Sequence, residues 1–362
     1  MKTYRAAVIG CSRMGGFIDN EVIGYPTIVL PMSHAAGYTA CARTDLVACA
    51  DMRPEVMAEF GRRYNVPPQA QYTDYRELIE KEKPDIVSVA TQPEQRAEIV
   101  IYAAEHGVKA IYAEKAFAAS LAEAEAMVAA VERNGVAFNL GANRRWATEY
   151  AAMKAVVDSG ELGALKSILI YSTGTLFNMG SHYFDLALLL NNDQPVEWVQ
   201  ATLRAQDDIF DGDLLRADPV GEGFVAFANG VTAYMLTTAR GGDCEVICEH
   251  GSLTAFNDGL TWQLRRRQPI DANGHTGLLD TPFTEPPRVS STLRLIEDLV
   301  AALDTGQPTQ GGARIALTGA ELIFAFIESH RQGGARVPLP LQQRALRLQR
   351  TYTGGHQPRY NA

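Results

Sequence analysis

One lysine of this sequence is especially well placed for chemistry. Residues 108–113 are largely apolar and end at the charged pair Glu114 and Lys115. A capped helical segment follows, so the pattern predicts a strand with Lys115 at its carboxyl end, the edge of open α/β sheets where ligands bind. A lysine that is desolvated there can lose its proton near working pH. The alternative is a strand-end lysine that simply reaches solvent.

A glycine-rich turn follows the first predicted strand. Residues 4–9 are β-branched and apolar, and the G-x-G-x-x-G pattern comes next, with serine in place of its second glycine. Serine is small enough for the backbone to approach a pyrophosphate, so the turn predicts dinucleotide binding. The residues expected to line this part of the cofactor site are Gly10, Ser12, Arg13, Met14 and Gly15.

An acidic residue ends the second predicted strand, at Asp51. An acid at this position accepts hydrogen bonds from the adenosine ribose and favours NAD as the cofactor. Met52 and Arg53 follow and are expected beside the cofactor. Because Arg53 can stack on adenine or tolerate a 2′-phosphate, NADP remains open.

An apolar insertion separates the glycine turn from Asp51 by more than the usual ~20 residues. It covers about residues 17–32, and a helix is expected to continue from Ser33. Two interpretations remain open. The insertion lines a substrate pocket or a subunit contact, or it packs on its own domain.

The first part of the chain alternates strands and helices, which predicts a doubly wound parallel sheet over residues 1–140. Another strand ends at Thr91, and Gln92 and Pro93 then open a helix through residue 106. These three residues are therefore expected at the same sheet edge as Lys115. The alternation is typical of doubly wound domains.

The pattern changes after residue 140, where a helix is expected from Asn143 to about residue 159. Strand-like segments separated by short turns predict a large, open, mainly antiparallel sheet, and two helices are expected at residues 291–303 and 314–331. Residues 141–362 are therefore predicted to form one α/β domain. Its polar tail from residue 342 carries several arginines and is a candidate contact with a neighbouring subunit.

Composition excludes several classes of function. The 362 residues carry a formal net charge of −9, which argues against nucleic acid or an anionic membrane as the main partner. No apolar stretch is long enough to cross a membrane, and the start shows no secretory segment. The five cysteines are irregularly spaced, and the seven histidines are scattered. We therefore expect a metal-free protein of the cytoplasm with reduced thiols.

The ordered motifs resemble the Gfo/Idh/MocA family of NAD(P)-dependent oxidoreductases. The resemblance covers nearly the whole chain and rests on the glycine turn, Asp51, residues 91–96, Glu114 with Lys115, residues 120–125, 143–145, 159–163 and 180–185. It implies a Rossmann domain followed by a domain with a large open sheet that often packs subunits together. A homodimer or homotetramer is therefore expected. The implied chemistry is hydride transfer at a secondary alcohol of a sugar, inositol or related polyol.

The resemblance also assigns roles to residues. Lys115 matches the lysine of the family's Glu-Lys-Pro motif, and His182 matches its catalytic histidine. The chain departs from the family with Ala116 after the lysine, with Arg96 in place of a histidine, and with Asn178 in place of an aspartate.

These roles are chemically consistent. A histidine that titrates near neutral pH can exchange the hydroxyl proton, and a lysine can donate to the substrate oxygen. Neutral Asn178 can orient a hydroxyl but cannot raise the basicity of its neighbours. Tyr183 and Arg144 are further candidate contacts with the substrate.

Two other functions remain open. One is redox-neutral chemistry, in which NAD oxidises a sugar transiently so that elimination, hydrolysis or epimerisation can follow. The other is a non-catalytic NAD(P)-binding sensor, which would need neither Lys115 nor His182. The sequence does not identify the substrate.

Overall fold

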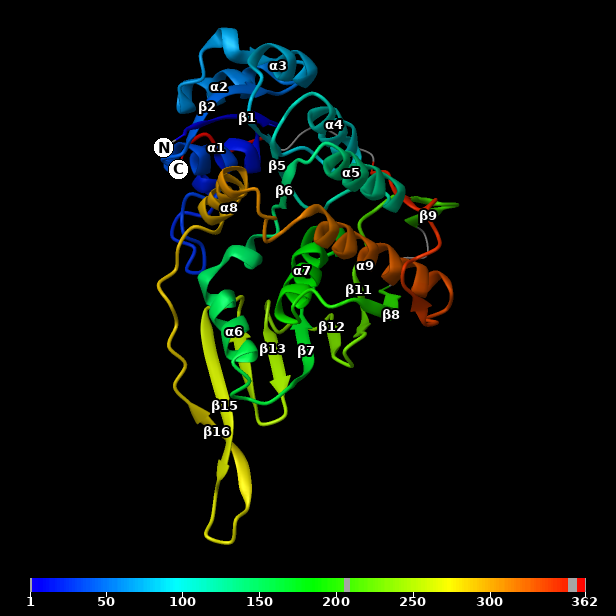
Figure 1. Cartoon of the computed structure of the whole chain (residues 1–362). Helices are drawn as coiled ribbons and strands as arrows, with labels where there is room; N and C mark the ends of the chain where they lie inside the picture. The colour runs from blue at the N-terminus through cyan, green and yellow to red at the C-terminus, as the bar shows by residue number, and fades with distance from the viewer. Residues whose placement is uncertain (1, 205–208, 351–356, 362) are drawn as a thin grey trace. The chain divides into compact units, whose positions relative to one another are not determined.

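The structure is a computed structural model that describes residues 2–204, 209–350 and 357–361. It contains two compact units (Figure 1). Unit 1 comprises Met1–Trp146, Val289–Ala320 and Arg347–Ala362, and unit 2 comprises Ala147–Arg288 and Glu321–Leu346. The first boundary lies near the predicted one at residue 140. Residues 289–320 and the described residues after 346 differ from the sequence interpretation, because they pack with the N-terminal unit.

The described residues of unit 1 contain a parallel sheet with strand order β3-β2-β1-β4-β5-β6. The strands are β1 (Tyr4–Ile9), β2 (Thr44–Ala50), β3 (Gln71–Tyr72), β4 (Ile86–Val89), β5 (Ala110–Ala113) and β6 (Ala137–Leu140). This is the doubly wound order of dinucleotide-binding domains: successive strands are added on one side of β1 up to β3, and on its other side from β4 onward. The predicted Rossmann fold is confirmed.

Several helices of unit 1 accompany this sheet, and the first five of them connect its strands. They are α1 (His34–Ala40), α2 (Pro54–Tyr64), α3 (Tyr75–Glu82), α4 (Pro93–Glu105), α5 (Leu121–Arg133) and α8 (Ser291–Thr305). The predicted start of α5 is correct, because the Ser120 hydroxyl accepts the Glu123 amide at 3.2 Å and caps the helix. Helix α8 buries Leu295, Ile296 and Leu299 on one face, which explains why this late segment joins unit 1.

Unit 2 contains, within the described part of the chain, a mixed sheet with strand order β16-β15-β14-β13-β7-β12-β11-β8-β17. The strands are β7 (Leu165–Tyr171), β8 (Val196–Leu203), β11 (Gly221–Phe227), β12 (Thr232–Leu236), β13 (Cys244–Cys248), β14 (Gly251–Phe256), β15 (Thr261–Pro269), β16 (Thr276–Thr281) and β17 (Val337–Pro338). Only β7 and β12 pair in parallel among these neighbours. The predicted mainly antiparallel sheet is therefore confirmed.

The helices of unit 2 are α6 (Thr148–Asp158), α7 (Ser181–Leu190) and the second half of α9 (Ala313–Arg331). Helix α7 is apolar on nearly every side. The ring of Phe184 meets Phe326 of α9 edge-on at 4.9 Å, which joins the two helices. The Ser329 hydroxyl on α9 accepts the Ala201 amide of β8 at 2.9 Å, so α9 is also fixed to the sheet.

Two local features differ from the sequence interpretation. The continuous helix expected over residues 143–159 is a 3₁₀ turn, η4 (Asn143–Trp146), followed by α6. The long hairpin of β15 and β16 was not predicted (Figure 1). Its strands carry charged and exposed side chains on both faces, so they lack the apolar alternation typical of a half-buried strand.

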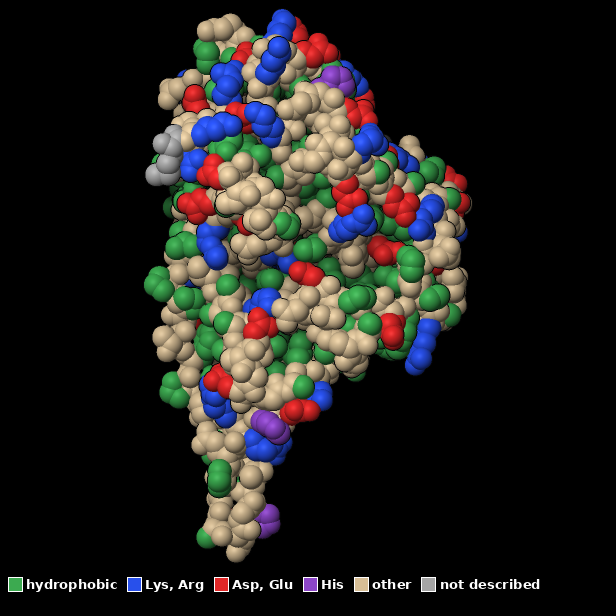
Figure 2. Space-filling model, in the orientation of Figure 1, with side chains coloured by type: hydrophobic (Ala, Val, Ile, Leu, Met, Phe, Trp, Pro, Cys, Tyr) green, Lys and Arg blue, Asp and Glu red, His purple; other side chains and the backbone are tan. Residues whose placement is uncertain are grey.

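Short elements complete the chain. The β9 (Phe210–Asp211) and β10 (Leu214–Leu215) strands pair in antiparallel, and β18 (Arg347–Leu348) belongs to unit 1. The face drawn in Figure 2 has interspersed acidic and basic side chains. All five cysteines are buried thiols, and two of them, Cys244 and Cys248, lie in β13.

Candidate functional site

The glycine turn closes tightly over the carboxyl end of β1. Gly10 has a φ of +93°, and a Cβ there would lie 3.0 Å from the Ala90 carbonyl atoms. A Cβ on Gly15 would lie 1.9 Å from the Gly10 oxygen. Both positions therefore require glycine. Between them, Arg13 is exposed and its Nε donates to Glu21 at 2.7 Å, while Ser12 and Met14 are half-buried.

Asp51 joins this turn to the end of β2. Its Oδ2 accepts the Cys11 amide at 2.8 Å, and its Oδ1 accepts the Arg53 amide at 2.9 Å. Arg53 Nε also lies 3.4 Å from Oδ1. A carboxylate has about four acceptor sites, so it can still accept ribose hydroxyls. Met52 is 75% exposed.

The described end of the chain lies against the turns that follow the glycines. The Tyr360 ring meets Phe17 edge-on at 4.9 Å, and the Asn20 amide donates to the Arg359 carbonyl at 2.6 Å. Burial raises the pKa of Tyr360, and Arg53 nearby lowers it. This tail segment therefore packs on its own unit beside the end of β2. Residues 351–356 of the tail lie outside the described residues.

Arg96, a departure from the family pattern, is 1% exposed and joins two turns at this sheet edge. Its guanidinium donates to the carbonyl oxygens of Thr91, after β4, and Ala116, after β5. Burial lowers the pKa of Arg96 to about 10, while the Glu114 carboxylate opposes that shift. The Thr91 hydroxyl oxygen is buried and has no hydrogen-bond partner among the described residues. Gln92 is exposed and Pro93 is buried.

Glu114 directly precedes Lys115 in the chain, and its side chain is buried, with 4% of the residue exposed. Its Oε1 lies 3.1 Å from Nε2 of His34, and its Oε2 accepts the Lys115 amide at 3.2 Å. Burial raises the pKa of Glu114, but the hydrogen bond from His34 and the charges of Lys115 and Arg96 outweigh it, so the net shift is downward. The ionised carboxylate therefore stabilises the fold above its unfolded pKa of ~4.3, and this contribution is lost as pH falls through the folded pKa.

Asn178 and His182 lie in unit 2, where a π-helical turn, η5 (Leu176–Gly180), leads into α7. Their spacing of four residues places both side chains on one face of this helical segment. Asn178 is exposed and His182 is half-buried. Tyr183 is 2% exposed, and its hydroxyl is close enough to Gly242 to exclude a Cβ there. It therefore faces the interior of unit 2.

Asp218 holds the start of this segment. Its Oδ1 accepts the Phe177 amide at 2.9 Å, and its Oδ2 accepts the Asn178 amide at 3.0 Å and the Thr175 hydroxyl at 2.6 Å. Such a carboxylate satisfies amides that have no partner within their own helical turn. Asp218 was not predicted as a site residue, because its hydrogen-bond partners lie about forty positions earlier in the chain.

Replacing Asp218 with alanine is expected to lower the free energy of unfolding by about 1–2 kcal/mol, the usual cost of losing a cap. Turnover should fall as well, because Asn178 loses its fixed backbone. Denaturant unfolding and kcat measure the two effects. Asp211→Ala is the matched control, since Asp211 is exposed and pairs with exposed Arg216. Equal stability and turnover in the two variants would show that Asp218 neither stabilises unit 2 nor positions Asn178.

Arg144 lies half-buried on η4, after the carboxyl end of β6. The neighbouring Arg145 is 4% exposed and donates to the Gln310 carbonyl at 3.3 Å. Trp146 is 1% exposed, as expected of a core residue. The Asn143 side-chain oxygen is buried without a hydrogen-bond partner in the described ranges.

The structure thus gathers the predicted residues in two groups. In unit 1, the glycine turn, Asp51, Thr91, Glu114 and Lys115 all lie at the carboxyl edge of the parallel sheet. In unit 2, Asn178 and His182 share one face of a helical segment. The glycine turn and the partnerless Thr91 hydroxyl are features that a dinucleotide at this edge would use.

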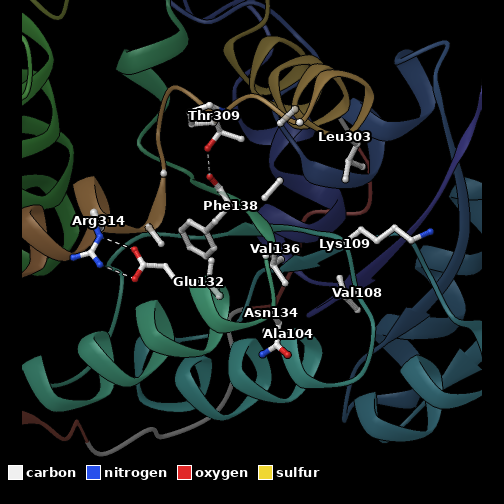
Figure 3. Close-up of a pocket in the computed structure, with 18 of the residues that line it drawn as sticks. Ala104, Val108, Lys109, Glu132, Asn134, Val136, Phe138, Leu303, Thr309 and Arg314 are labelled. Carbon is white, nitrogen blue, oxygen red and sulfur yellow. Dashed lines mark hydrogen bonds and ion pairs between the residues drawn. The ribbon is translucent and has the colours of Figure 1, made fainter.

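The cavity shown in Figure 3 lies at the opposite edge of the unit 1 sheet. Its volume is about 1010 Å³, and its lining includes Val108 and Val136, which precede β5 and β6. Glu132 and Arg314 form an ion pair at its side, 2.5 Å apart (Figure 3). Because ligands of doubly wound folds bind at the carboxyl edge, this cavity is separate from the candidate cofactor site.

Two further searches covered the described residues. They contain no group of three or more His, Cys, Asp or Glu side chains placed to hold a metal ion. None of their helices combines the length and apolar character needed to cross a membrane.

The fold and the glycine turn are typical of a dinucleotide-binding domain. Residues 19–142 match the Gfo/Idh/MocA family, described as an oxidoreductase family with an NAD-binding Rossmann fold. The match covers less than half of the chain. The predicted resemblance and the predicted NAD-binding domain are both confirmed.

Two dehydrogenases are similar to part of the chain. D-apiose dehydrogenase of Rhizobium rhizogenes is 30% identical over 163 residues, which cover 45% of this chain and 42% of that protein. Myo-inositol 2-dehydrogenase of Thermotoga maritima is 26% identical over 166 residues, which cover 42% of this chain and 49% of that protein. The chain spans less than half the length of these relatives.

Solved structures share the fold over almost the whole chain. Levoglucosan dehydrogenase in complex with NADH and levoglucosan has a TM-score of 0.73 and 21% identity, and covers 94% of this chain and 100% of its own. An inositol dehydrogenase homologue from Azotobacter vinelandii, in complex with NADH and myo-inositol, has a TM-score of 0.72 and 18% identity. It covers 93% of this chain and 98% of its own. At these identities the likeness establishes the fold alone.

Proposed function

We propose that this protein is an NAD-dependent oxidoreductase that transfers a hydride to or from a secondary alcohol of a sugar, inositol or related polyol. The observation that carries the proposal is a half-buried Lys115 at the cofactor edge of an NAD-binding Rossmann unit. The names of the similar proteins, which act on apiose and inositol, support the substrate class.

Each proposed catalytic residue has one task. NAD, when bound, supplies the acceptor for the hydride that leaves the carbinol carbon. The amine of Lys115 donates a hydrogen bond to the substrate oxygen and stabilises its developing charge. The imidazole of His182 takes the hydroxyl proton, so that the alcohol loses one hydride and one proton and becomes a carbonyl.

Other residues orient the reactants. Exposed Asn178 can both donate to and accept from a substrate hydroxyl. Arg144 remains a proposed contact with the substrate. The burial of Tyr183 instead favours a role in packing α7. On the cofactor side, the proposed set is the glycine turn with Asp51, Met52 and Arg53, together with Thr91, Gln92, Pro93 and Glu114.

A screen of sugars and polyols tests this function. The purified protein is mixed with NAD or NADP and with D-apiose, myo-inositol, levoglucosan and related compounds, and NADH or NADPH absorbance is followed. The proposal expects reduction of NAD with at least one of them. Failure with every compound, in both reaction directions, would contradict it.

Redox-neutral sugar chemistry is the second candidate function. It is favoured by Asn178, which replaces a carboxylate with a neutral amide at the proposed substrate face. Cofactor that copurifies, with product formed but no net NADH, would identify it. The third possibility, a non-catalytic sensor, leaves Lys115 and His182 without a purpose.

Asp51→Ala is expected to raise the dissociation constant of NADH roughly 10- to 100-fold, because hydrogen bonds to a charged group contribute about 1.5–3 kcal/mol. Preference for NAD over NADP should fall too, since Asp51 repels a 2′-phosphate. Calorimetric titration with both cofactors measures these changes. Glu55→Ala, an exposed acid in the first turn of α2, is the control. An unchanged dissociation constant for Asp51→Ala would exclude this role.

We propose that a second copy of the chain is the partner of the unit 2 sheet. Aromatic side chains cluster there, with Phe224 lying 5.5 Å from Trp198 and 6.0 Å from Tyr234. Tyr234 is 37% exposed, as sheet faces that pack subunits often are before assembly. Light scattering would report a dimer or tetramer, or a monomer if this is wrong. A location in the cytoplasm stays a prediction from the odd number and irregular spacing of the cysteines.

A further inference from the structure

The C-terminal end of the apolar insertion, residues 31–33, forms hydrogen bonds with two other segments of unit 1. Asp19 is 7% exposed, and its two carboxylate oxygens accept the amides of Met32 and Ser33, each at 2.9 Å. From α8, the Ser290 hydroxyl donates to the Pro31 carbonyl, and the Thr292 hydroxyl donates to the Met32 carbonyl at 2.9 Å. These contacts fix the start of α1, although the middle of the insertion leaves apolar side chains such as Ile23 exposed.

The first residue of α1 is a completely buried histidine. His34 is 0% exposed and stacks on Tyr112 with a centroid distance of 3.7 Å. Its Nδ1 lies 2.8 Å from the Ser88 hydroxyl of β4, and that hydroxyl lies 2.8 Å from the Tyr38 hydroxyl. Its Nε2 lies 3.1 Å from Glu114.

One arrangement of protons satisfies this whole series of contacts. Tyr38 donates to Ser88, Ser88 donates to Nδ1, and a proton on Nε2 is donated to the Glu114 carboxylate. The other oxygen of Glu114 accepts the Lys115 amide. The Ser88, His34 and Glu114 side chains are too deeply buried for a substrate to reach, so they do not form a hydrolytic triad. Their contacts instead end at the backbone of Lys115.

We propose that His34 is a positioning residue for Lys115, and that the insertion at residues 17–32 serves to fix it. His34 holds one oxygen of Glu114, so the other oxygen is aimed at the Lys115 amide. The Arg96 guanidinium holds the next carbonyl, that of Ala116. The lysine turn is therefore restrained on both sides. The effect on turnover depends on the proposed catalytic role of Lys115. The hydrogen bonds that hold the Lys115 backbone do not depend on that role.

The test compares two replacements of His34. His34→Met keeps the bulk of the side chain and removes both hydrogen bonds, while His34→Gln keeps a donor that can reach Glu114. His106→Gln is the control, since His106 is an exposed histidine at the end of α4. Hydrogen–deuterium exchange follows the peptide that contains the Lys115 amide, and steady-state kinetics with the best polyol give kcat and KM.

The expected result is faster exchange at the Lys115 peptide in His34→Met, with exchange near wild type in His34→Gln and His106→Gln. The kcat of His34→Met should fall by about 10- to 100-fold, as expected for a misplaced catalytic group, with KM for NAD unchanged. Wild-type exchange and kcat in His34→Met would overturn the proposal. Equal losses in His34→Met and His34→Gln would also overturn it, because they would reflect packing alone.

Two further measurements keep the outcome decisive. If His34→Met does not fold, Ser88→Ala removes the donor to Nδ1 without changing the histidine, and it should also speed exchange at the Lys115 peptide. The exchange measurement needs no substrate. If wild-type protein oxidises no polyol, the proposed function fails, while exchange still decides whether His34 positions Lys115.

Discussion

Replacing Lys115 with methionine is expected to lower kcat by about 10²- to 10³-fold, the usual effect of removing one donor to a developing oxyanion. Methionine keeps most of the length and apolar volume of the lysine stem but cannot donate a hydrogen bond. The half-buried side chain follows β5 at the carboxyl edge of the sheet, so its loss should not unfold the domain. Initial rates of NADH formation, measured with the polyol that the wild-type protein oxidises fastest, give kcat for the variant.

The control for this variant is Lys109→Met. Lys109 precedes the same strand and pairs with Asp85 at 2.6 Å, at the edge of the sheet away from the cofactor turn. Its replacement should leave kcat unchanged. The dissociation constant of NADH should stay nearly the same in both variants. If Lys115→Met keeps normal turnover, Lys115 is a strand-end lysine that only reaches solvent.

Replacing His182 with glutamine is expected to lower kcat by about 10²- to 10⁴-fold, the usual contribution of a general acid or base. In alcohol oxidation the wild-type enzyme should gain activity as pH rises and the imidazole loses its proton. This rise should vanish in the variant. A pH profile of kcat/KM therefore separates loss of the base from a general loss of structure.

His275→Gln is the matched control for His182. His275 lies in the exposed turn between β15 and β16, where Nδ1 is 2.5 Å from Asp271. It should keep the wild-type profile. A His182 variant whose profile is unchanged would remove this residue from the proposed mechanism, whatever the effect of Lys115→Met.

The sequence predicted the cofactor edge well because that edge is encoded locally. Strand β1 and helix α2 have the predicted bounds, since each combines a clear apolar pattern with a glycine or proline at its end. The Ser120 cap is likewise a contact between near neighbours in the chain. Parallel strands then place their carboxyl ends together without further information.

The residues that hold the site were harder to predict, because their partners are distant in the sequence. His34 meets Glu114 across eighty positions, and Asp218 meets Asn178 across forty. Arg96 was noted only as a departure from the family pattern, although it is a buried link between two turns. No periodicity or motif identifies such pairs, since only tertiary packing brings them together.

Residues 289–320 were predicted in the wrong domain for the same reason, because the residues that they contact are distant in the sequence. The amphipathic pattern of α8 predicted a helix but not the surface that it covers. Its contacts include the hydrogen bond from Thr292 to Met32 at the C-terminal end of the insertion. The hairpin of β15 and β16 was not predicted for a different reason: its exposed strands carry no apolar pattern.

Isotope transfer is the most direct test of the central claim. The protein is incubated with NAD and with polyols that carry deuterium on their carbinol carbons, and the cofactor is analysed by mass spectrometry. The account predicts net formation of NADH that carries one deuterium, and its loss in Lys115→Met and His182→Gln. Cofactor that remains oxidised and free of deuterium with every polyol would contradict it.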